Sequence, residues 1–448
     1  MIRATTGGVL KSYRANLMNS FIGMNKSRDT VLSQRIFNSF AEDPAAAAKA
    51  FRLRKSRMTV DSQHSICSDT LKKYQTAFSC LQSMDEALDT DTASPLKTIG
   101  GMTKTWLNDP TGDAREQLTK ALDQVSELLV QDMNQKYGDN FIFAGADGHN
   151  VPFEIKDNKL YYRGVSVDAA VPEVVMGTDG NPMEIKADTN QVTGGGGSYV
   201  KLDTSALIKR SDYDNIVIND PTATQPKILY KAAPPAGDPQ RFNAEGEPDD
   251  NGDYYLNMDK AETMTTKDYD AQKLEAEKLE YLKNEKYYVD IGLGFQENEN
   301  GELIPSSGFN AALNGINFFG CGLDEDGDPK NIYSLVQKLT QLSDSVPEDG
   351  DWEGSVWDEF DRLVGKLEIA SSKFKTEFTN LDASTTKLEN NEKLLEDNFY
   401  NLQEQYAALE DVDMVDSITS FVWAQYCYNA ALKVGNSVLS ESLMDYLN

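Results

Sequence analysis

The sequence predicts a mainly α-helical fold with a β-rich insert, and three observations lead to this prediction. Leucines recur every seven positions near the C-terminus, apolar residues keep the same spacing in the N-terminal third, and short alternating segments between turn residues fill the middle. A narrow apolar stripe is buried only against another helix. We therefore expect the long N- and C-terminal helices to form a coiled-coil bundle, from which the middle β domain projects.

Two long helices are expected in the N-terminal part. The first spans residues 8–33. Three of its apolar positions follow heptad spacing: Leu10, Leu17 and Met24. Residues 36–42 interrupt this pattern. Asp43 then has the features of an N-cap and Pro44 those of a first helical residue, so a second helix of about 45 residues is expected to begin there.

The middle of the chain changes from helical to β-rich character. A third helix is expected from Pro110 to Tyr137, and a charged surface helix from Asp268 to Lys286. Alternating segments between Gly, Pro, Asn and Asp residues predict short strands. These segments are Lys159–Val167, Val171–Met176, Tyr199–Leu202, Ile216–Ile218, Ile228–Tyr230 and Tyr287–Phe295.

Helices resume at Asn331 and lead into a long closing helix. Because neither Pro nor Gly occurs from Leu367 to Val434, about 68 residues are expected to form one helix of roughly 100 Å. Its seam consists of leucines seven residues apart: Leu381, Leu388, Leu395, Leu402 and Leu409. The sequence thus predicts a helical terminal region (1–35 and 412–448), a helical rod (36–150 and 325–411) and a projecting β-rich domain (151–324).

The terminal region is the expected contact between copies of the chain. Its apolar faces have no evident cover within the chain except each other, and uncovered apolar faces are typical of interaction surfaces. The candidate assembly and packing residues combine these faces with the leucine seam. They are Leu10, Leu17, Met24, Leu388, Leu395, Leu402, Leu409, Val412, Ile418, Val422, Leu443 and Leu447.

The charge of the chain excludes some partners and suggests one contact. A net charge of -29 argues against nucleic acid or an anionic membrane as the main partner. Residues 1–60 carry 11 Lys and Arg against 3 Asp and Glu, whereas residues 388–448 carry 2 against 11. The two ends are therefore electrostatic complements, although solvated faces of opposite sign are the alternative. The first residues also lack the apolar core of a secretory signal peptide, which by itself favours a cytoplasmic protein.

The sequence contains no recognisable motif for catalysis or metal binding. With only His64 and His149 in the chain, a zinc motif of the H-E-x-x-H type is excluded. The acidic runs that begin at Asp249 and Asp324 lack the spacing of a calcium-binding loop and are expected to be acidic turns. We therefore predict no catalytic, cofactor or metal site, and expect a protein that is not an enzyme.

Three stretches of the chain carry a family resemblance. The first is Arg35-Ile-Phe-Asn-Ser-Phe-Ala-Glu-Asp-Pro-Ala-Ala-Ala, the second is Asn134-Gln-Lys-Tyr-Gly-Asp-Asn-Phe-Ile-Phe-Ala-Gly, and the third is Ser440-Glu-Ser-Leu-Met-Asp-Tyr-Leu. In these stretches the chain resembles the flagellin superfamily, and within it most closely the hook-associated proteins of the hook–filament junction. The resemblance covers roughly residues 1–155 and 330–448.

This resemblance implies a function, a location and partners. It implies a structural subunit without a cofactor that forms a homo-oligomeric ring and contacts an adjacent hook-associated protein and flagellin. It also implies secretion to the extracellular flagellum by type III export without a cleaved signal peptide, with an export chaperone on the C-terminal region. Nucleic acid and membrane are not implied partners. A flagellin-like filament subunit is the alternative, and an intracellular coiled-coil adaptor with a β recognition domain is another.

Overall fold

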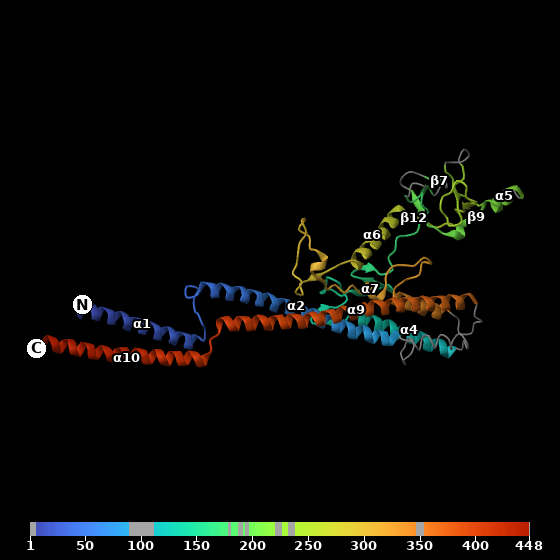
Figure 1. Cartoon of the computed structure of the whole chain (residues 1–448). Helices are drawn as coiled ribbons and strands as arrows, with labels where there is room; N and C mark the ends of the chain where they lie inside the picture. Colours follow the sequence, from blue (N-terminus) through green and yellow to red (C-terminus); the bar gives the residue numbers. More distant parts are fainter. Residues whose placement is uncertain are drawn as a thin grey trace. The chain divides into compact units, whose positions relative to one another are not determined.

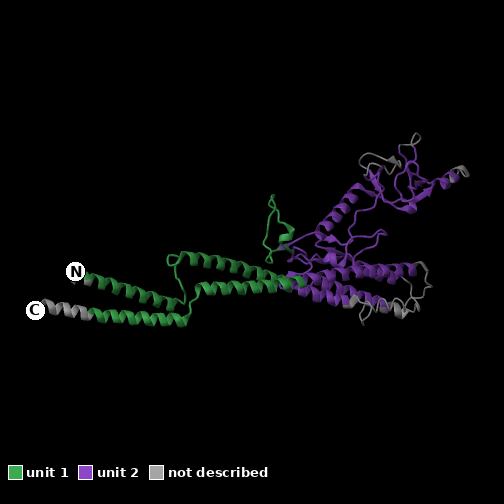
Figure 2. Cartoon of the chain, viewed as in Figure 1, with its two compact units in different colours: residues 1–71, 289–309, 386–448 green, residues 72–288, 310–385 purple. Residues whose placement is uncertain are grey.

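The computed structural model describes residues 6–88, 112–177, 181–186, 191–192, 197–219, 226–231, 238–345 and 354–447. In these residues the chain is mainly helical: long helices from its two ends pack together, and small antiparallel sheets lie in the middle part (Figure 1). The predicted fold class is therefore confirmed. The chain divides into two compact units, residues 1–71, 289–309 and 386–448, and residues 72–288 and 310–385 (Figure 2).

Unit 1 contains two helix pairs. Helix α1 (Thr6–Ser33) packs along α10 (Met414–Leu447). The first part of α2 (Pro44–Leu88) lies against the last part of α9 (Gly354–Glu410), where Cys67 and Leu388 are fully buried. The carboxylate of Asp43 accepts the N–H groups of residues 45 and 46 at 3.1 and 2.9 Å, which confirms the predicted cap.

The prediction of one unbroken closing helix is wrong, because α9 ends at Glu410 and α10 begins at Met414. The carboxylate of Asp413 caps α10 by accepting the N–H groups of residues 415 and 416. The backbone that leaves α9 pairs with the segment after α1: the N–H of Ile36 donates to the carbonyl of Glu410 at 2.8 Å. The break is thus stabilised by a cap and by pairing with a distant segment, without Pro or Gly.

Unit 2 has a helical core. It combines the second part of α2, the first part of α9, α4 (Gly112–Met133) and α8 (Ile332–Ser345). The predicted apolar face of the third helix is confirmed for its five members in α4, which are all buried: Leu118, Leu122, Val125, Leu129 and Met133. The predicted end at Tyr137 is wrong, because the helix ends at Met133 and Tyr137 belongs to a short strand. On the other helices the rings of Phe78 and Phe378 lie 4.8 Å apart and join α2 to α9.

Small antiparallel sheets form the rest of unit 2. One hairpin pairs β1 (Lys136–Tyr137) with β2 (Asn140–Phe141). A second sheet has the order β3 (Phe153–Lys156), β4 (Lys159–Tyr162), β5 (Val165–Ser166). A third has the order β12 (Thr263–Thr265), β8 (Ser198–Val200), β6 (Glu184–Lys186), β7 (Gln191–Val192), and a fourth β10 (Arg241–Phe242), β11 (Tyr254–Leu256), β9 (Leu207–Lys209).

Shorter elements complete the chain. They are α5 (Arg210–Asn219), α6 (Thr266–Lys283), α7 (Gly315–Phe319), the paired strands β13 (Tyr288–Val289) and β14 (Phe309–Asn310), and 3₁₀ turns at Thr204–Ala206 and Pro305–Ser307. The predicted surface helix in the charged insertion is confirmed as α6. None of the helices in the described part of the chain is long and apolar enough to cross a membrane.

Several predicted strands differ from the structure. Residues Ile216–Ile218 belong to helix α5, in which Arg210 and Asp214 form an ion pair one turn apart. The segments 171–176 and 228–230 contain only isolated bridges. The strand predicted from Tyr287 to Phe295 ends at Val289, since Asp290 accepts the N–H groups of Gly292 and Gly294. Gly292 has a φ of +98°, a conformation that a strand does not contain.

Candidate assembly surface

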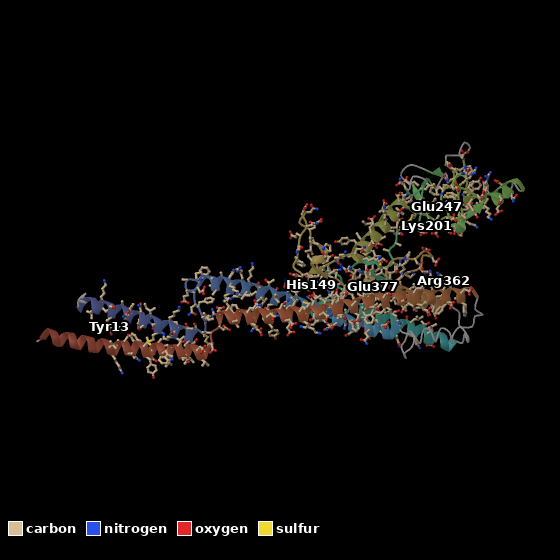
Figure 3. All side chains as sticks on the ribbon, in the orientation of Figure 1. Tyr13, His149, Lys201, Glu247, Arg362 and Glu377 are labelled. Carbon is tan, nitrogen blue, oxygen red and sulfur yellow. The ribbon has the colours of Figure 1, made fainter. Side chains whose placement is uncertain are left out.

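Helices α1 and α10 run antiparallel and approach closely. The hydroxyl of Tyr13, labelled in Figure 3, donates a hydrogen bond to the carbonyl of Ala431 at 3.0 Å. Farther along the pair, the ring centroids of Phe21 and Tyr428 lie 5.6 Å apart. A Cβ atom at the buried Gly435 would collide with the hydroxyl of Tyr13. Glycine at this position therefore leaves room for the Tyr13 side chain where it reaches α10.

The outer faces of α1 and α10 expose many large apolar side chains. Leu32 and Val415 are 74% exposed, and Trp423 is 67% exposed. The full set, which we call the terminal surface, consists of Leu10, Met18, Phe21, Ile22, Leu32, Val415, Ile418, Val422, Trp423, Tyr426, Leu432 and Val434. Scattered apolar residues are normal on a protein surface, but a run along two paired helices is typical of an interaction surface.

The structure places the predicted assembly residues in different environments. Three are exposed on the terminal surface: Leu10, Ile418 and Val422. Three others on or beside the same helix pair are half-buried: Leu17, Met24 and Val412. Four lie on α9, the first two buried and the last two half-buried: Leu388, Leu395, Leu402 and Leu409. The side chains of the remaining two lie outside the described residues: Leu443 and Leu447.

A polar cluster joins the two helix pairs of unit 1. The carboxylate of Glu410 is buried, with 4% of its side chain exposed, and it forms ion pairs with Arg35 at 2.9 Å and Arg54 at 3.3 Å. Arg54 also donates to the hydroxyl of Tyr406 at 2.8 Å, and this hydrogen bond raises the pKa of the guanidinium. Arg57 lies over the same ring at 5.4 Å from its centroid. Burial at this cluster positions α1 and α10 relative to α2 and α9 within the unit.

Sequence reasoning did not identify Glu410. Because α9 is rich in acidic residues, the sequence does not distinguish this carboxylate from the solvated ones. Its burial depends on the three-residue break between α9 and α10. The opposite charges of the two chain ends were a partial signal, because Arg35 and Arg54 belong to the basic end and Glu410 to the acidic end. That part of the predicted complementarity corresponds to contacts in the structure.

The acidic turn at residues 324–328 in unit 2 gathers three carboxylates. Oxygens of Asp324, Asp326 and Asp328 lie within 4.8 Å of one another, a spacing that a cation such as calcium can bridge. Lys366 occupies the centre instead, at 2.6 Å from Asp324 and 2.7 Å from Asp326. Arg362, on α9 in Figure 3, binds Asp328 as well. Lys366 and Arg362 therefore neutralise the negative charge of the turn, and their ion pairs attach the turn to α9.

Asp328 is the most buried member of this cluster, and its side chain is 2% exposed. Burial by itself would raise the pKa of this carboxyl. Hydrogen bonds from Arg362, Lys338 and Lys366 outweigh that effect and hold the pKa well below its usual range. The cluster is thus a charged structural contact of α8, α9 and the turn.

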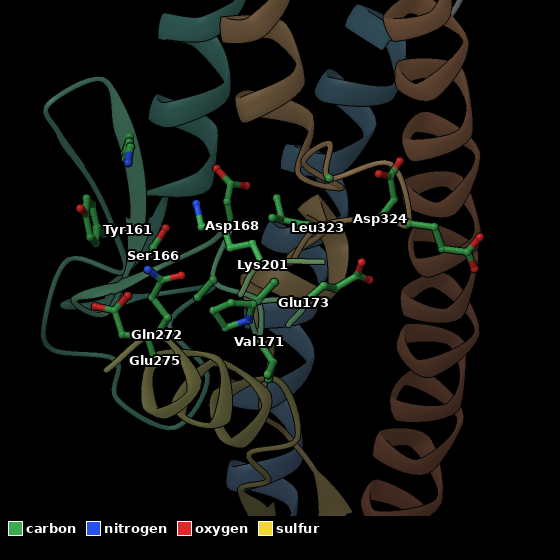
Figure 4. A pocket seen from close by; sticks show the side chains of 16 residues that line it. Tyr161, Ser166, Asp168, Val171, Glu173, Lys201, Gln272, Glu275, Leu323 and Asp324 are labelled. Atoms are coloured by element: carbon green, nitrogen blue, oxygen red, sulfur yellow. The ribbon is translucent and has the colours of Figure 1, made fainter. Parts of the chain in front are cut away.

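A polar hollow of about 840 Å³ lies in unit 2 beside the acidic turn, and Asp324 of that turn is among its lining residues (Figure 4). Asp168, Glu173 and Lys201 are among its lining residues, and seven of the sixteen carry charges. One oxygen of Asp168 accepts the hydroxyl of Ser334 at 2.8 Å, and burial raises the pKa of this carboxyl. Small-molecule sites are mostly lined by apolar and aromatic side chains. This hollow has the opposite character, so the terminal surface is the stronger candidate for function.

Comparison with known proteins gives remote structural similarities. No family model matches the chain, and no curated protein matches it. The structure is similar to one described as that of a flagellar hook-associated protein from Vibrio parahaemolyticus, with 9% identity and a TM-score of 0.42, over 83% of this chain and 100% of the other. It is also similar to FlgL from Xanthomonas campestris, with 14% identity and a TM-score of 0.36, over 80% of this chain and 99% of the other. Both TM-scores lie below 0.5, so the function proposed below rests on this chain's own residues.

Proposed function

We propose that the protein is a structural subunit of the bacterial flagellum that joins the hook to the filament, as a hook-associated protein 3 does. The observation that carries this proposal is the terminal surface: α1 and α10 pair with each other and leave aromatic and aliphatic side chains uncovered along their outer faces. The three family-like stretches quoted above support the flagellar assignment. In this role the protein has no catalytic step and no cofactor.

The exposed apolar area of the terminal surface favours assembly. Buried apolar area contributes about 25 cal/mol per Å², and a single copy leaves this contribution unused on the outer faces of α1 and α10. Neighbouring copies in a homo-oligomeric ring would cover these faces. The helical terminal region (1–35 and 412–448) would then form the contacts, the rod (36–150 and 325–411) would support them, and the β-rich domain (151–324) would project.

The role also assigns partners and a location. The adjacent hook-associated protein would lie on one side of the ring and the first flagellin subunits on the other. Before assembly, an export chaperone would cover the C-terminal region, because the exposed apolar residues of α10 would otherwise aggregate. The protein would leave the cell by type III export and act in the extracellular flagellum.

The alternatives differ in where the protein is found, so localisation is the test. An antibody against the full chain would be applied to isolated flagella, and its position read by immunogold electron microscopy. We expect gold particles at one place, where the hook meets the filament. Label along the whole filament would identify a filament subunit instead. Protein found only in the cytosol, with unlabelled flagella, would favour the intracellular adaptor and overturn the proposal.

A further inference from the structure

Helix α2 carries a stripe that unit 1 leaves uncovered. Phe51, Lys55 and Met58 follow one another at spacings of four and three residues and therefore share one helix face. Phe51 is 67% exposed and Met58 63% exposed. Lys55 and the neighbouring Arg52 are also exposed, and within the described residues neither forms an ion pair. We call Phe51, Arg52, Lys55 and Met58 the basic stripe.

A groove continues the basic stripe at its N-terminal end. It has a volume of about 680 Å³, and Phe40, Phe51 and Arg52 are among its lining residues. Phe40 is 64% exposed. Aromatic and arginine side chains are enriched where protein interfaces derive most of their binding energy. The stripe and groove together thus have the composition of an interface, with a positive charge.

The segment 289–309 of the same unit has complementary properties. It carries four acidic residues and neither Lys nor Arg. Leu293 is 46% exposed and Phe295 is 50% exposed. Three glutamates follow them, all exposed: Glu297, Glu299 and Glu302. The segment thus presents two apolar side chains next to an acidic tip, and Figure 2 shows it rising from the helices of unit 1.

Hydrogen bonds hold this segment in a defined shape. At its base, Asp290 accepts a hydrogen bond from the side-chain amide of Gln63 at 2.9 Å. Near the tip, the side-chain carbonyl of Asn298 accepts the N–H of Glu302, also at 2.9 Å. The hydroxyl of Ser307 accepts the N–H of Gln296 at 3.0 Å. A segment ordered before binding loses less conformational entropy when it docks.

We propose that the segment 289–309 of one copy docks on the basic stripe of a neighbouring copy. Leu293 and Phe295 would pack on Phe51 and Met58, while the glutamates would face Arg52 and Lys55. The segment is attached at Gln63, about eight residues or about 12 Å along α2 from Lys55. A neighbour that lies beside this helix and is shifted by that distance along it would bring its segment level with the stripe. The inference rests on the proposed assembly, and a head-to-tail contact of this kind generates a ring when its rotation closes.

Cross-linking between two versions of the full chain tests the contact. Both versions carry Cys427→Ser, which removes an exposed thiol. One version is affinity-tagged and has Met58→Cys, and the other is untagged and has Phe295→Cys. A short bis-maleimide should give a dimer of one tagged and one untagged chain, at least tenfold more abundant than with the control Ser56→Cys. Ser56 is exposed on the same helix and lies on a different face from Phe51 and Met58.

Charge reversal provides the second measurement. Either Arg52→Glu with Lys55→Glu, or Glu297→Lys with Glu299→Lys, should weaken self-association in sedimentation at least tenfold at low salt. The four changes together should restore it. The control Lys49→Glu, an exposed residue on the side of α2 opposite Phe51 and Met58, should leave self-association unchanged.

Several outcomes would overturn the docking. Oligomers that form without the cross-link would refute the docking and leave the junction role standing. Capture of Met58→Cys by Val415→Cys in place of Phe295→Cys would make the acidic C-terminal region the occupant. A chain that remains monomeric at every concentration would refute docking by a second copy, whereas the junction role is judged separately by immunogold labelling of flagella.

Discussion

Arg35 and Glu410 meet at 2.9 Å, where the chain leaves α1 and where it leaves α9. Arg35 follows α1, and Glu410 is the last residue of α9. Between them the backbone forms a bridge from Arg35 to Asp411. This ion pair and this backbone bridge are among the contacts that connect the two ends of the chain, at the point from which the terminal surface extends.

Replacing Glu410 tests the importance of this connection. Glu410→Gln keeps the shape of the side chain but leaves Arg35 and Arg54 without a buried carboxylate. Because both arginines are about half exposed, the expected loss of unfolding free energy is only about 1–2 kcal/mol. Urea denaturation measures it. Glu404→Gln, an exposed position on the same helix, should change stability by less than about 0.5 kcal/mol. Equal effects of the two changes would refute the role assigned to Glu410.

The close approach of α1 and α10 gives a second prediction. Gly435→Ala should push Tyr13 out of its hydrogen bond with Ala431 and increase hydrogen exchange in both helices. Gly23→Ala on α1 is the matched control, because its Cβ atom meets nothing within 4 Å. Alanine there should stabilise the helix by up to about 1 kcal/mol. Slower exchange in α10 of Gly435→Ala would contradict the described pairing.

The acidic turn predicts a dependence on pH. Since the folded-state pKa of Asp328 lies below its value in the unfolded chain, its charged form stabilises the fold above the unfolded value. This contribution is lost as the pH falls through the folded-state pKa. Unfolding free energy should therefore decrease with acid below about pH 4. Asp328→Asn should cost about 2–3 kcal/mol at pH 7 and flatten the acid dependence.

Asp326→Asn serves as the control for this titration, because the Asp326 side chain is 67% exposed. Its effect at pH 7 should be smaller than that of Asp328→Asn. The measurement is urea denaturation between pH 2 and pH 7. Hydrogen exchange in α8 and α9 is followed over the same pH range. An unchanged acid dependence in Asp328→Asn would show that other carboxylates determine it.

The cysteines provide a probe of assembly. Burial raises the pKa of Cys67 and raises that of Cys80 to about 12, so both thiols should resist iodoacetamide at pH 8. Cys427 is exposed on α10 and should react in the isolated chain. In isolated flagella, neighbouring copies should protect it at least tenfold, as read by mass spectrometry. Equal labelling in both states would place this face of α10 outside the assembly contacts.

Local patterns were sufficient to predict the positions of most long helices and the first cap. Asp43 and Pro44 act within one turn, and the heptad leucines place Leu388 and Leu395 in the core of unit 1. Helix α5 was not predicted, since the β-branched run from Ile216 to Ile218 favours a strand when its neighbours are unknown. The exposed faces of α1 and α10 were expected from the absence of a covering segment.

The break between α9 and α10 was beyond sequence reasoning for a different reason. The groups that stabilise it lie at the other end of the chain, where residues 34 and 36 pair with the backbone on either side of Asp411. The cap at Asp413 was a visible signal, because aspartate is a favoured N-cap. An acidic helix offers many such residues, and only the pairing identifies the one that acts.

Deletion of the gene in the source bacterium tests the central claim most directly. Cells would be examined by electron microscopy, and the medium would be assayed for flagellin. If the protein is a junction subunit, the deletion strain should have hooks without filaments and should release flagellin into the medium. The wild-type gene should restore the filaments. Filaments of normal number and length on the deletion strain would contradict the account.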